Sequence, residues 1–421
     1  LAAVALALGT LVVFYSKAQM SGKLGDEKYY SSVIAMTGMI IGLGCANDLF
    51  NLWVWFEGMA VSSYLLVVFY RDRPSALEAG VKYLVQSAIG SVTVLIGIAL
   101  VFAYTGEVGF EALAAANLAT PVLLGVGALF TIGFGVKIAL VPMHTWLPDA
   151  HAQAPSGISA LLSGVVIEAG LIALLRVLGV LSGDVMPSWG VLLMVLAAVN
   201  MLLGNLMALR QKQVKRLLAY SSLSHVGYML LGIGIAIYAG QPGGAQGGLF
   251  HLVSHGMMKG LAFLAAGALI YAASGASHDT SQDHGLTLSD LDGAARRYPF
   301  TALALSIAVL GLGGLPPLVG FMSKWQIFVA GFEAQSVAVA ALVVFAALNS
   351  VLSLAYYAPM VNAVYRRQPS AAITGGVDLP VSMQIPMAVL TFAVIAVGFW
   401  PRLVYWLIVP AGSALSAAFG G

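Results

Sequence analysis

Residues 131–176 read TIGFGVKIALVPMHTWLPDAHAQAPSGISALLSGVVIEAGLIALLR, and this stretch decides the fold. Its first apolar segment carries one lysine, Lys137, and is interrupted at Val141-Pro142. A connector with two histidines and an aspartate follows, and the next apolar segment carries one glutamate, Glu168. Ionisable groups inside such apolar segments are costly, so they indicate a function within a membrane.

The composition indicates a polytopic helical membrane protein. Of the 421 residues, 60% are hydrophobic and 9% are charged, whereas soluble domains have about 25% charged residues. Apolar windows long enough to cross a bilayer recur along the chain. The net charge of +2 gives no indication of nucleic-acid binding. The single cysteine, Cys45, excludes a disulfide framework within this chain.

The apolar segments predict about twelve membrane-spanning helices, each long enough for a bilayer core of roughly 30 Å. The expected spans are 1–16, 30–48, 50–69, 81–104, 121–142, 158–181, 189–209, 217–239, 249–273, 299–331, 335–364 and 384–411. Proline should break the fifth span near Pro142 and the tenth at Gly311–Pro317. The first span has no cationic start, so we interpret it as a helix of the body and not as a signal peptide.

The two breaks lie five spans apart, so the two broken helices should cross the membrane in opposite directions. Interrupted helices at matching positions of two halves are typical of inverted repeats that hold an ion site between them. We therefore expect four regions. They are an N-terminal helix and loop (1–29), a first repeat (30–182), a second repeat (189–364) and a C-terminal loop and helix (365–421).

The basic residues support this topology. If alternate loops beginning with residues 17–29 are placed on one side, called side X, 14 of the 19 basic residues fall there. The positive-inside rule then predicts that side X faces the cytoplasm. These residues are Lys17, Lys23, Lys28, Arg71, Arg73, Lys82, Arg210, Lys212, Lys215, Arg216, Arg296, Arg297, Arg366 and Arg367.

Glu57 lies about seven residues inside the third apolar span, and its plausible partner is Lys137. The alternative is that the Glu57 side chain extends its carboxylate to the membrane–water interface. A nearby carboxylate and burial act in opposite directions on a lysine, so small movements would change its proton affinity. The pair is therefore a candidate proton-loading site.

His251, His255 and Lys259 are spaced by four, which places them on one face of a helix. Three titratable groups in register favour a proton path, whereas a zinc site would need a third ligand that the sequence does not supply.

Two further residues have open alternatives. Lys324 follows the second break and is either an exit group or an interfacial anchor beside Trp325. His225 is either part of the path or a packing residue. In the connector, His144, Asp149 and His151 lie at a membrane edge, as a proton entrance or merely solvated. Lys215, which lies just before the span 217–239, is most simply a topology determinant.

Four long motifs resemble the antiporter-like membrane subunits of respiratory complex I. Related subunits of Mrp sodium/proton antiporters and membrane-bound hydrogenases are similar. The motifs are VKIALVPMHTWLPDAHAQAPSGISALLSG, VKRLLAYSSLSHVGYMLLG, FHLVSHGMMKGLAFLAAGA and GLGGLPPLVGFMSKW. NDLFNLWVWFEGMAVSSYLLV looks closest to the Mrp D-type subunit, whereas the other motifs suit M- or N-type complex I subunits.

The resemblance implies fourteen helices with two inverted five-helix repeats, so two N-terminal helices are expected to be absent here. It implies a hydrated axis that matches Glu57, Lys137, His251, His255, Lys259 and Lys324. Many relatives carry lysine or histidine where this chain has Glu168, which leaves open whether it pumps by the usual scheme.

We therefore expect a proton-translocating, non-redox subunit of an NADH:quinone oxidoreductase in a bacterial or archaeal inner membrane. No cofactor is expected in this chain, and partner subunits would carry FMN, iron–sulfur clusters and quinone. Its other partners would be membrane subunits, lipid and protons, with sodium as an alternative ion. The competing hypotheses are a subunit of an Mrp antiporter or hydrogenase, and a structural membrane scaffold.

Overall fold

The computed structural model describes residues 1–116, 118–181, 183–274, 285–366 and 368–419, and in these residues it contains helices and no β-strand. Arg367, one of the basic residues assigned to side X, lies outside them. The helices are α1 (Ala2–Met20), α2 (Asp26–Cys45), α3 (Leu49–Val67), α4 (Pro74–Thr105), α5 (Phe110–Ala114), α6 (Thr120–Ile138), α7 (Trp146–Gln153), α8 (Ser156–Leu161), α9 (Ile167–Val180), α10 (Met186–Leu209), α11 (Val214–Ala239), α12 (Pro242–Ser274), α13 (Pro299–Gly313), α14 (Val319–Glu333), α15 (Val337–Val364), α16 (Ala371–Thr374), α17 (Val381–Phe399) and α18 (Arg402–Ala418).

Short turns of other kinds interrupt this series. A π-helical turn, η1 (Leu162–Val166), joins α8 to α9, and η2 (Gly183–Val185), η3 (Leu288–Leu291) and η4 (Ala294–Arg296) are 3₁₀ turns.

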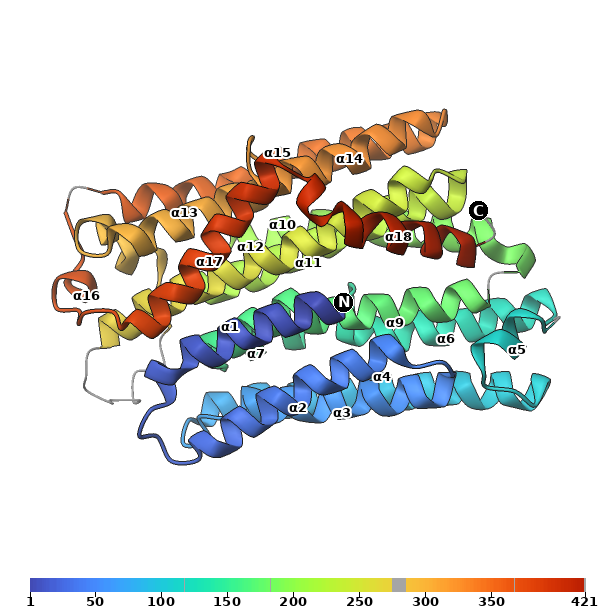
Figure 1. Ribbon diagram of the computed structural model, residues 1–421, viewed down its shortest axis with the longest axis horizontal. Helices are drawn as coiled ribbons and strands as arrows, with labels where there is room; N and C mark the ends of the chain where they lie inside the picture. Colours follow the sequence, from blue (N-terminus) through green and yellow to red (C-terminus); the bar gives the residue numbers. More distant parts are fainter. Residues whose placement is uncertain (117, 182, 275–284, 367, 420–421) are drawn as a thin grey trace.

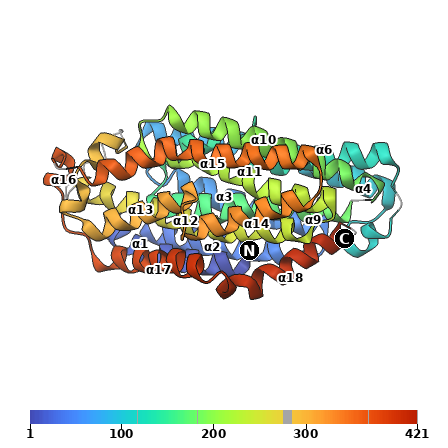
Figure 2. The same ribbon diagram turned by 90° about the horizontal axis from the view of Figure 1, so that it is seen from above.

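The long helices lie roughly parallel, with α2, α3 and α4 along one edge and α13, α14 and α15 along the other (Figure 1). Helices α11 and α12 lie between these edges. Seen from above, α17 and α18 run along one side of the molecule and α10 along the opposite side (Figure 2). The segment from α8 to α9 is the most enclosed, since 94% of its apolar window is buried against 39% for α4. Glu168, which belongs to this segment, therefore lies in the enclosed middle of the bundle.

Nine helices in the described part of the chain are long and apolar enough to cross a membrane. Three expected spans lack such a helix: those at α2 and α3, and the tenth, which is divided between α13 and α14. The expected total of about twelve, and the inverted repeat, therefore stay predictions.

Both expected breaks occur. Helix α6 ends at Ile138 and is followed by Ala139 in the left-handed conformation, a few residues earlier than predicted near Pro142. Helix α13 ends at Gly313, and Gly314 has φ 83°, which glycine adopts without steric cost.

The expected last span, 384–411, needs a correction because it is not one continuous helix. Helix α17 ends at Phe399 and α18 begins at Arg402, with Trp400-Pro401 between them. Proline cannot donate a backbone hydrogen bond, so it is found at such helix starts. The chain therefore has a third interrupted apolar segment.

Candidate functional site

Glu168 lies in the first turn of α9, directly after the π-helical turn η1. Its Oε1 atom is 3.0 Å from Nδ1 of His255 on α12, and both side chains have no exposed surface. Its other oxygen, Oε2, is buried without a hydrogen-bond partner among the described residues. Single π-helical turns are frequent at functional sites because the extra residue changes the direction of the side chains that follow.

Two glycines bring these helices close enough for that contact. A Cβ atom at Gly256 would lie 2.8 Å from the carbonyl oxygen of Gly164 in η1. The same Cβ would lie 3.6 Å from Oε2 of Glu168. Since no side chain separates the two backbones, His255 reaches the carboxylate directly.

The predicted histidine face of α12 continues onto two neighbouring helices. Nδ1 of His225 on α11 is 2.9 Å from Nε2 of His251, and Nδ1 of His251 is 2.9 Å from the hydroxyl of Ser323 on α14. The rings of His225 and His255 have centroids 5.3 Å apart. His225 therefore belongs to the cluster and is not an isolated packing residue.

Lys259 lies one helical turn beyond His255 on α12 and is also wholly buried. Its ammonium group donates a 2.6 Å hydrogen bond to the carbonyl oxygen of Leu218 on α11, and another to the hydroxyl of Ser221. The predicted stripe on α12 thus faces the buried side of α11.

Lys324 lies on α14, just after the second break, with 3% of its surface exposed. Its Nζ atom donates to the carbonyl oxygen of Leu312 at 2.9 Å and to the hydroxyl of Ser350 at 2.8 Å. It also lies 4.5 Å from the ring centroid of Tyr228. Trp325 is 55% exposed, so the two neighbours point in different directions. The burial of Lys324 does not fit an interfacial anchor beside Trp325.

Lys137 is buried at the end of α6 among hydroxyl groups. Its Nζ atom donates to the hydroxyls of Tyr83 at 2.7 Å and Ser63 at 3.2 Å, and lies over the Tyr83 ring. The ring of Tyr83 stacks on Trp146, at a centroid distance of 4.0 Å. The indole nitrogen of Trp146 in turn donates to the carbonyl oxygen of Val136. This packing fixes the lysine beside the first break.

Glu57 is half-buried on α3, and its Oε1 atom has no hydrogen-bond partner in the part of the chain that the structure describes. Its expected partner is Lys137 on α6. No ion pair joins the two among the described residues, so the structure does not bring this expected pair into contact.

The buried groups form two sets. One runs from Glu168 through the histidines to Tyr228 and Lys324, since the Tyr228 and His251 rings lie 5.6 Å apart. The other is the Lys137 cluster. No hydrogen bond or ion pair between the described residues joins Lys137 to Glu168, although a Cβ atom at Gly170 would lie 3.3 Å from that of Lys137. The two sets are neighbours without direct contact.

Sequence reasoning missed the hydroxyl partners, because nothing in the sequence separates these serines and tyrosines from others in apolar spans. It also misjudged His151 in the connector and Lys215 at the start of α11. His151 is wholly buried and not at a solvated edge, and Lys215 is 7% exposed, which does not fit a simple topology determinant. Asp149 does lie near the surface, where it pairs with Lys82 and Arg216.

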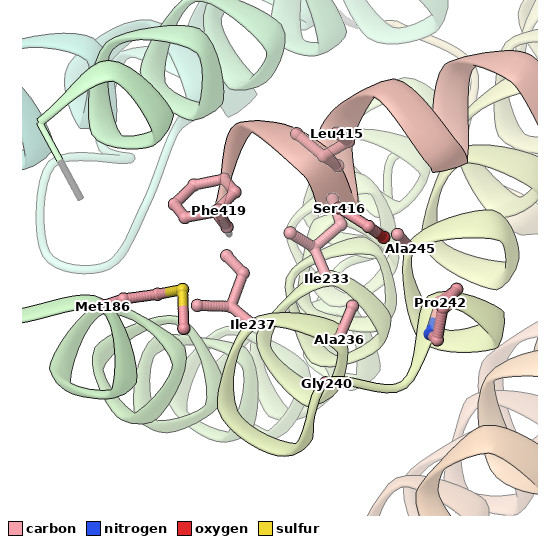
Figure 3. A pocket seen from close by; sticks show the side chains of 10 residues that line it. All are labelled: Met186, Ile233, Ala236, Ile237, Gly240, Pro242, Ala245, Leu415, Ser416 and Phe419. Atoms are coloured by element: carbon pink, nitrogen blue, oxygen red, sulfur yellow. The ribbon is translucent and has the colours of Figure 1, made fainter. Parts of the chain in front are cut away.

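Two further observations concern metal binding and cavities. In the described residues, no group of three or more histidine, cysteine, aspartate or glutamate side chains could hold a metal ion. A separate apolar pocket lies between α18 and the ends of α11 and α12 (Figure 3). Its lining includes Ile233, Leu415 and Phe419 and none of the ionisable residues above. The candidate site is therefore the buried ionisable line and not this pocket.

Comparisons with known proteins agree with these features. The model of the family described as NADH:quinone oxidoreductase/Mrp antiporter, transmembrane region, matches residues 46–353. F(420)H(2) dehydrogenase subunit N of Methanosarcina mazei is 34% identical over 384 residues, covering 89% of this chain and 75% of that protein. NADH-quinone oxidoreductase subunit N of Desulfitobacterium hafniense is 35% identical over 362 residues, covering 80% and 69%. A chain of respiratory complex I from Thermus thermophilus with bound NADH superposes with a TM-score of 0.82 at 27% identity, covering 100% of this chain and 84% of that one.

Proposed function

The chain belongs to the NADH:quinone oxidoreductase/Mrp antiporter family, and from this we propose that it is a proton-translocating, antiporter-like membrane subunit of a respiratory complex. Its partners are other membrane subunits, as in the complex I that it resembles. We further propose that the chain holds no redox group, and that partner subunits carry FMN, iron–sulfur clusters and quinone.

The buried line from Glu168 to Lys324 is the observation that carries this proposal. An isolated charge in a dry interior is so costly that such groups neutralise, pair or move with their surroundings. A carboxylate, three imidazoles and two amines lie in this one interior. Each of these groups can take up and release a proton, so the line supports proton transfer.

The proposed path begins on side X, reaches Lys137 and crosses to the region of Glu168. It continues through His255, Lys259 and the His225–His251 pair and leaves near Lys324. An imidazole passes a proton by accepting it on one ring nitrogen and releasing another from the second nitrogen. The 3.0 Å Glu168–His255 contact and the 2.9 Å His225–His251 contact are short enough for such transfers.

The separation between Lys137 and Glu168 is the proposed control point. A carboxylate favours the charged form of a nearby lysine, so a movement of Glu57 towards or away from Lys137 would change how readily Lys137 holds a proton. Redox chemistry in partner subunits would drive this change. Side X, with most of the basic loops, is proposed to be the cytoplasmic side of a bacterial or archaeal inner membrane.

Purification of the intact complex through a tag on this chain tests the assembly. We expect iron–sulfur and flavin-binding subunits to copurify. In sealed vesicles, oxidation of the electron donor should acidify the interior. Recovery of small cation-exchanger subunits, with sodium-driven proton movement and no quinone reduction, would instead identify an Mrp antiporter.

Lys137→Ala in the same complex separates a proton path from a structural scaffold. Pumping should fall by about tenfold or more if Lys137 handles protons. Lys17→Ala is the matched control, because Lys17 is exposed at the end of α1. Normal pumping by an assembled Lys137→Ala complex would support the scaffold instead.

A further inference from the structure

A basic cluster outside the buried line lies where the connector between α1 and α2 meets the connector between α3 and α4. Its centre is the ring of Tyr70, just beyond the end of α3. The ammonium nitrogen of Lys23 lies 4.7 Å from the centroid of this ring, and the guanidinium carbon of Arg73 lies 4.8 Å from it. Two cations that share one aromatic ring repel each other, so this arrangement favours an anion beside them.

Neither cation has an anionic partner among the described residues. The salt bridges in that part of the chain involve other basic residues, and the adjacent acid Asp72 is exposed and takes part in none of them. The Nε atom of Arg73 is buried and has no hydrogen-bond partner there. Burial and the neighbouring Arg73 lower the pKa of Lys23. A bound anion would oppose this lowering, because an opposite charge favours the charged form of a lysine.

Two further groups at this place suit an anionic ligand that also carries hydroxyl groups. Helix α4 begins at Pro74, directly after Arg73, and its first turn has no acidic residue and no side-chain cap. The positive end of the helix dipole therefore adds to the charge of the two cations. Gln19 on α1 donates from Nε2 to the Tyr70 hydroxyl at 3.3 Å, and its Oε1 atom is buried without a partner in the described part of the chain. This oxygen can accept a hydrogen bond from a ligand hydroxyl.

Aromatic packing holds the ring that the two cations share. Tyr70 contacts Phe69 edge to face with centroids 5.5 Å apart, and Phe69 contacts Tyr29 of α2 in the same way at 5.3 Å. The hydroxyl of Tyr29 is 2.8 Å from the hydroxyl of Ser16 on α1. The ring is therefore fixed by α1, α2 and the end of α3, and the basic cluster is already formed without a ligand.

The cluster lies at the ends of the helices and not in the middle of the bundle. Lys23 and Arg73 both belong to loops assigned to side X. Leu24, which follows Lys23, has 89% of its surface exposed. Basic pockets between membrane-spanning helices on the cytoplasmic side bind anionic headgroups. A basic pocket beside an exposed apolar side chain suits a lipid, whose phosphate and acyl chains are joined in one molecule.

We propose that Lys23, Arg73 and Gln19 form a binding site around Tyr70 for the phosphate group of an anionic ligand. An anionic lipid headgroup and free phosphate share this chemistry. The planar guanidinium can donate two parallel hydrogen bonds to phosphate oxygens, and the lysine supplies a second positive charge. A bound headgroup would connect the loop after α1 to the start of α4, the helix that carries Tyr83 of the Lys137 cluster. The site needs no proton transfer, so it does not depend on the proposed function.

Acylation of lysines in the intact complex tests the site without any substitution. The complex is placed in nanodiscs of phosphatidylcholine, of phosphatidylcholine with phosphatidylglycerol, or of phosphatidylcholine with inorganic phosphate in solution. Lys28 on α2 is the internal control, because it is exposed and meets the same bulk membrane charge. A bound phosphate group should slow the acylation of Lys23 by about fivefold relative to Lys28, the factor expected for one basic contact to an anionic headgroup.

The three nanodisc conditions distinguish the sources of the phosphate group. Slow acylation of Lys23 only with phosphatidylglycerol identifies a lipid headgroup as the ligand. Slow acylation with inorganic phosphate identifies the free anion as a ligand. A ratio of Lys23 to Lys28 acylation that is the same in all three conditions overturns the proposal.

A matched pair of double variants tests the two cations directly. Lys23→Gln with Arg73→Gln removes both, whereas Lys28→Gln with Arg71→Gln removes two exposed cations nearby with the same change in net charge. The first pair should weaken retention of phosphatidylglycerol by about thirtyfold, and the second pair should leave it unchanged. Native mass spectrometry of the complex measures the retained lipid, and binding of labelled phosphate replaces it if the free anion alone protects Lys23. Equal binding by the two double variants would overturn the proposal, and the acylation test decides if the first pair fails to assemble.

Discussion

Glu168 and His255 form a buried acid–base pair, with Oε1 and Nδ1 3.0 Å apart and no exposed surface on either side chain. A proton shared by such a pair belongs to both residues, because each changes the proton affinity of the other. Glu168 is the position where the family resemblance indicated a departure from the lysine or histidine of many relatives. A carboxylate beside a histidine keeps one acid and one base at this point of the line.

Replacing Glu168 with glutamine should abolish proton sharing while keeping the side-chain volume. We expect pumping to fall by about tenfold or more with little change in the amount of assembled complex. His255→Gln should have a similar effect, and the double variant should be no worse than either single one, since residues in one network are not additive. Strictly additive losses would contradict a shared proton. The measurement is donor-driven vesicle acidification at matched complex concentration.

Tyr83→Phe should weaken the support of Lys137. The substitution removes the hydroxyl that accepts from Nζ at 2.7 Å and keeps the ring that stacks on Trp146. We expect slower pumping and a loss of about 1 kcal/mol of stability. Tyr104→Phe is the control, because Tyr104 is 64% exposed. Equal pumping rates in the two variants would show that the hydroxyl does not assist Lys137.

The fold and much of the site follow from short-range patterns. Apolar runs indicate spans, prolines indicate breaks, and a spacing of four places His251, His255 and Lys259 on one face. These features depend on residues within one or two helical turns of each other, so the sequence contains them directly. The positions of Lys137 and Lys324 beside the two breaks follow in the same way.

The remaining contacts depend on how distant helices pack. Glu168 contacts His255 because Gly164 and Gly256 let the backbones of η1 and α12 approach closely. The residues around these two glycines do not distinguish them from the many other glycines of this chain. Glu57 and Lys137 were expected to pair from their charges, yet Lys137 instead contacts two hydroxyls. Opposite charge alone does not predict contact where neutral donors and acceptors compete at shorter range.

Gly256→Ala should separate α12 from η1. Its Cβ atom would lie 2.8 Å from the carbonyl oxygen of Gly164, so the backbones must move apart. Such overpacking costs about 1–3 kcal/mol, and the melting temperature of the purified complex should fall. Gly38→Ala in α2 is the control, because its Cβ atom would meet nothing within 4 Å. Equal melting temperatures for the two variants would contradict the close approach.

Arg176 on α9 holds the end of α2. Its guanidinium donates to the carbonyl oxygens of Leu43, Gly44 and Ala46, which have no partner within the helix. Arg176→Ala should therefore lower stability by about 1–3 kcal/mol. Arg176→Lys should recover only part of this, since an ammonium lacks the planar fork of donors. Equal unfolding midpoints for Arg176→Lys and the unchanged protein would show that the positive charge alone stabilises this helix end.

The end of α17, where the third apolar segment is interrupted, packs against the connector between α13 and α14, where the second is interrupted. A Cβ atom at Gly398, near the end of α17, would lie 2.3 Å from the carbonyl oxygen of Pro317 and 2.8 Å from the backbone nitrogen of Val319. This connector joins α13, whose Leu312 carbonyl oxygen accepts a 2.9 Å hydrogen bond from Nζ of Lys324, to α14, which carries Lys324. A side chain at position 398 would therefore displace the connector that precedes Lys324.

Gly398→Ala should shift this connector and weaken the contact between Lys324 and Leu312. We expect a stability loss of about 1–3 kcal/mol from overpacking, together with slower pumping. Gly125→Ala in α6 is the control, since its Cβ atom would have open space around it. Adding Lys324→Ala to each variant separates the two effects. If Gly398 acts by positioning Lys324, the double variant pumps no more slowly than Lys324→Ala alone, whereas a further loss would mean that the glycine acts elsewhere.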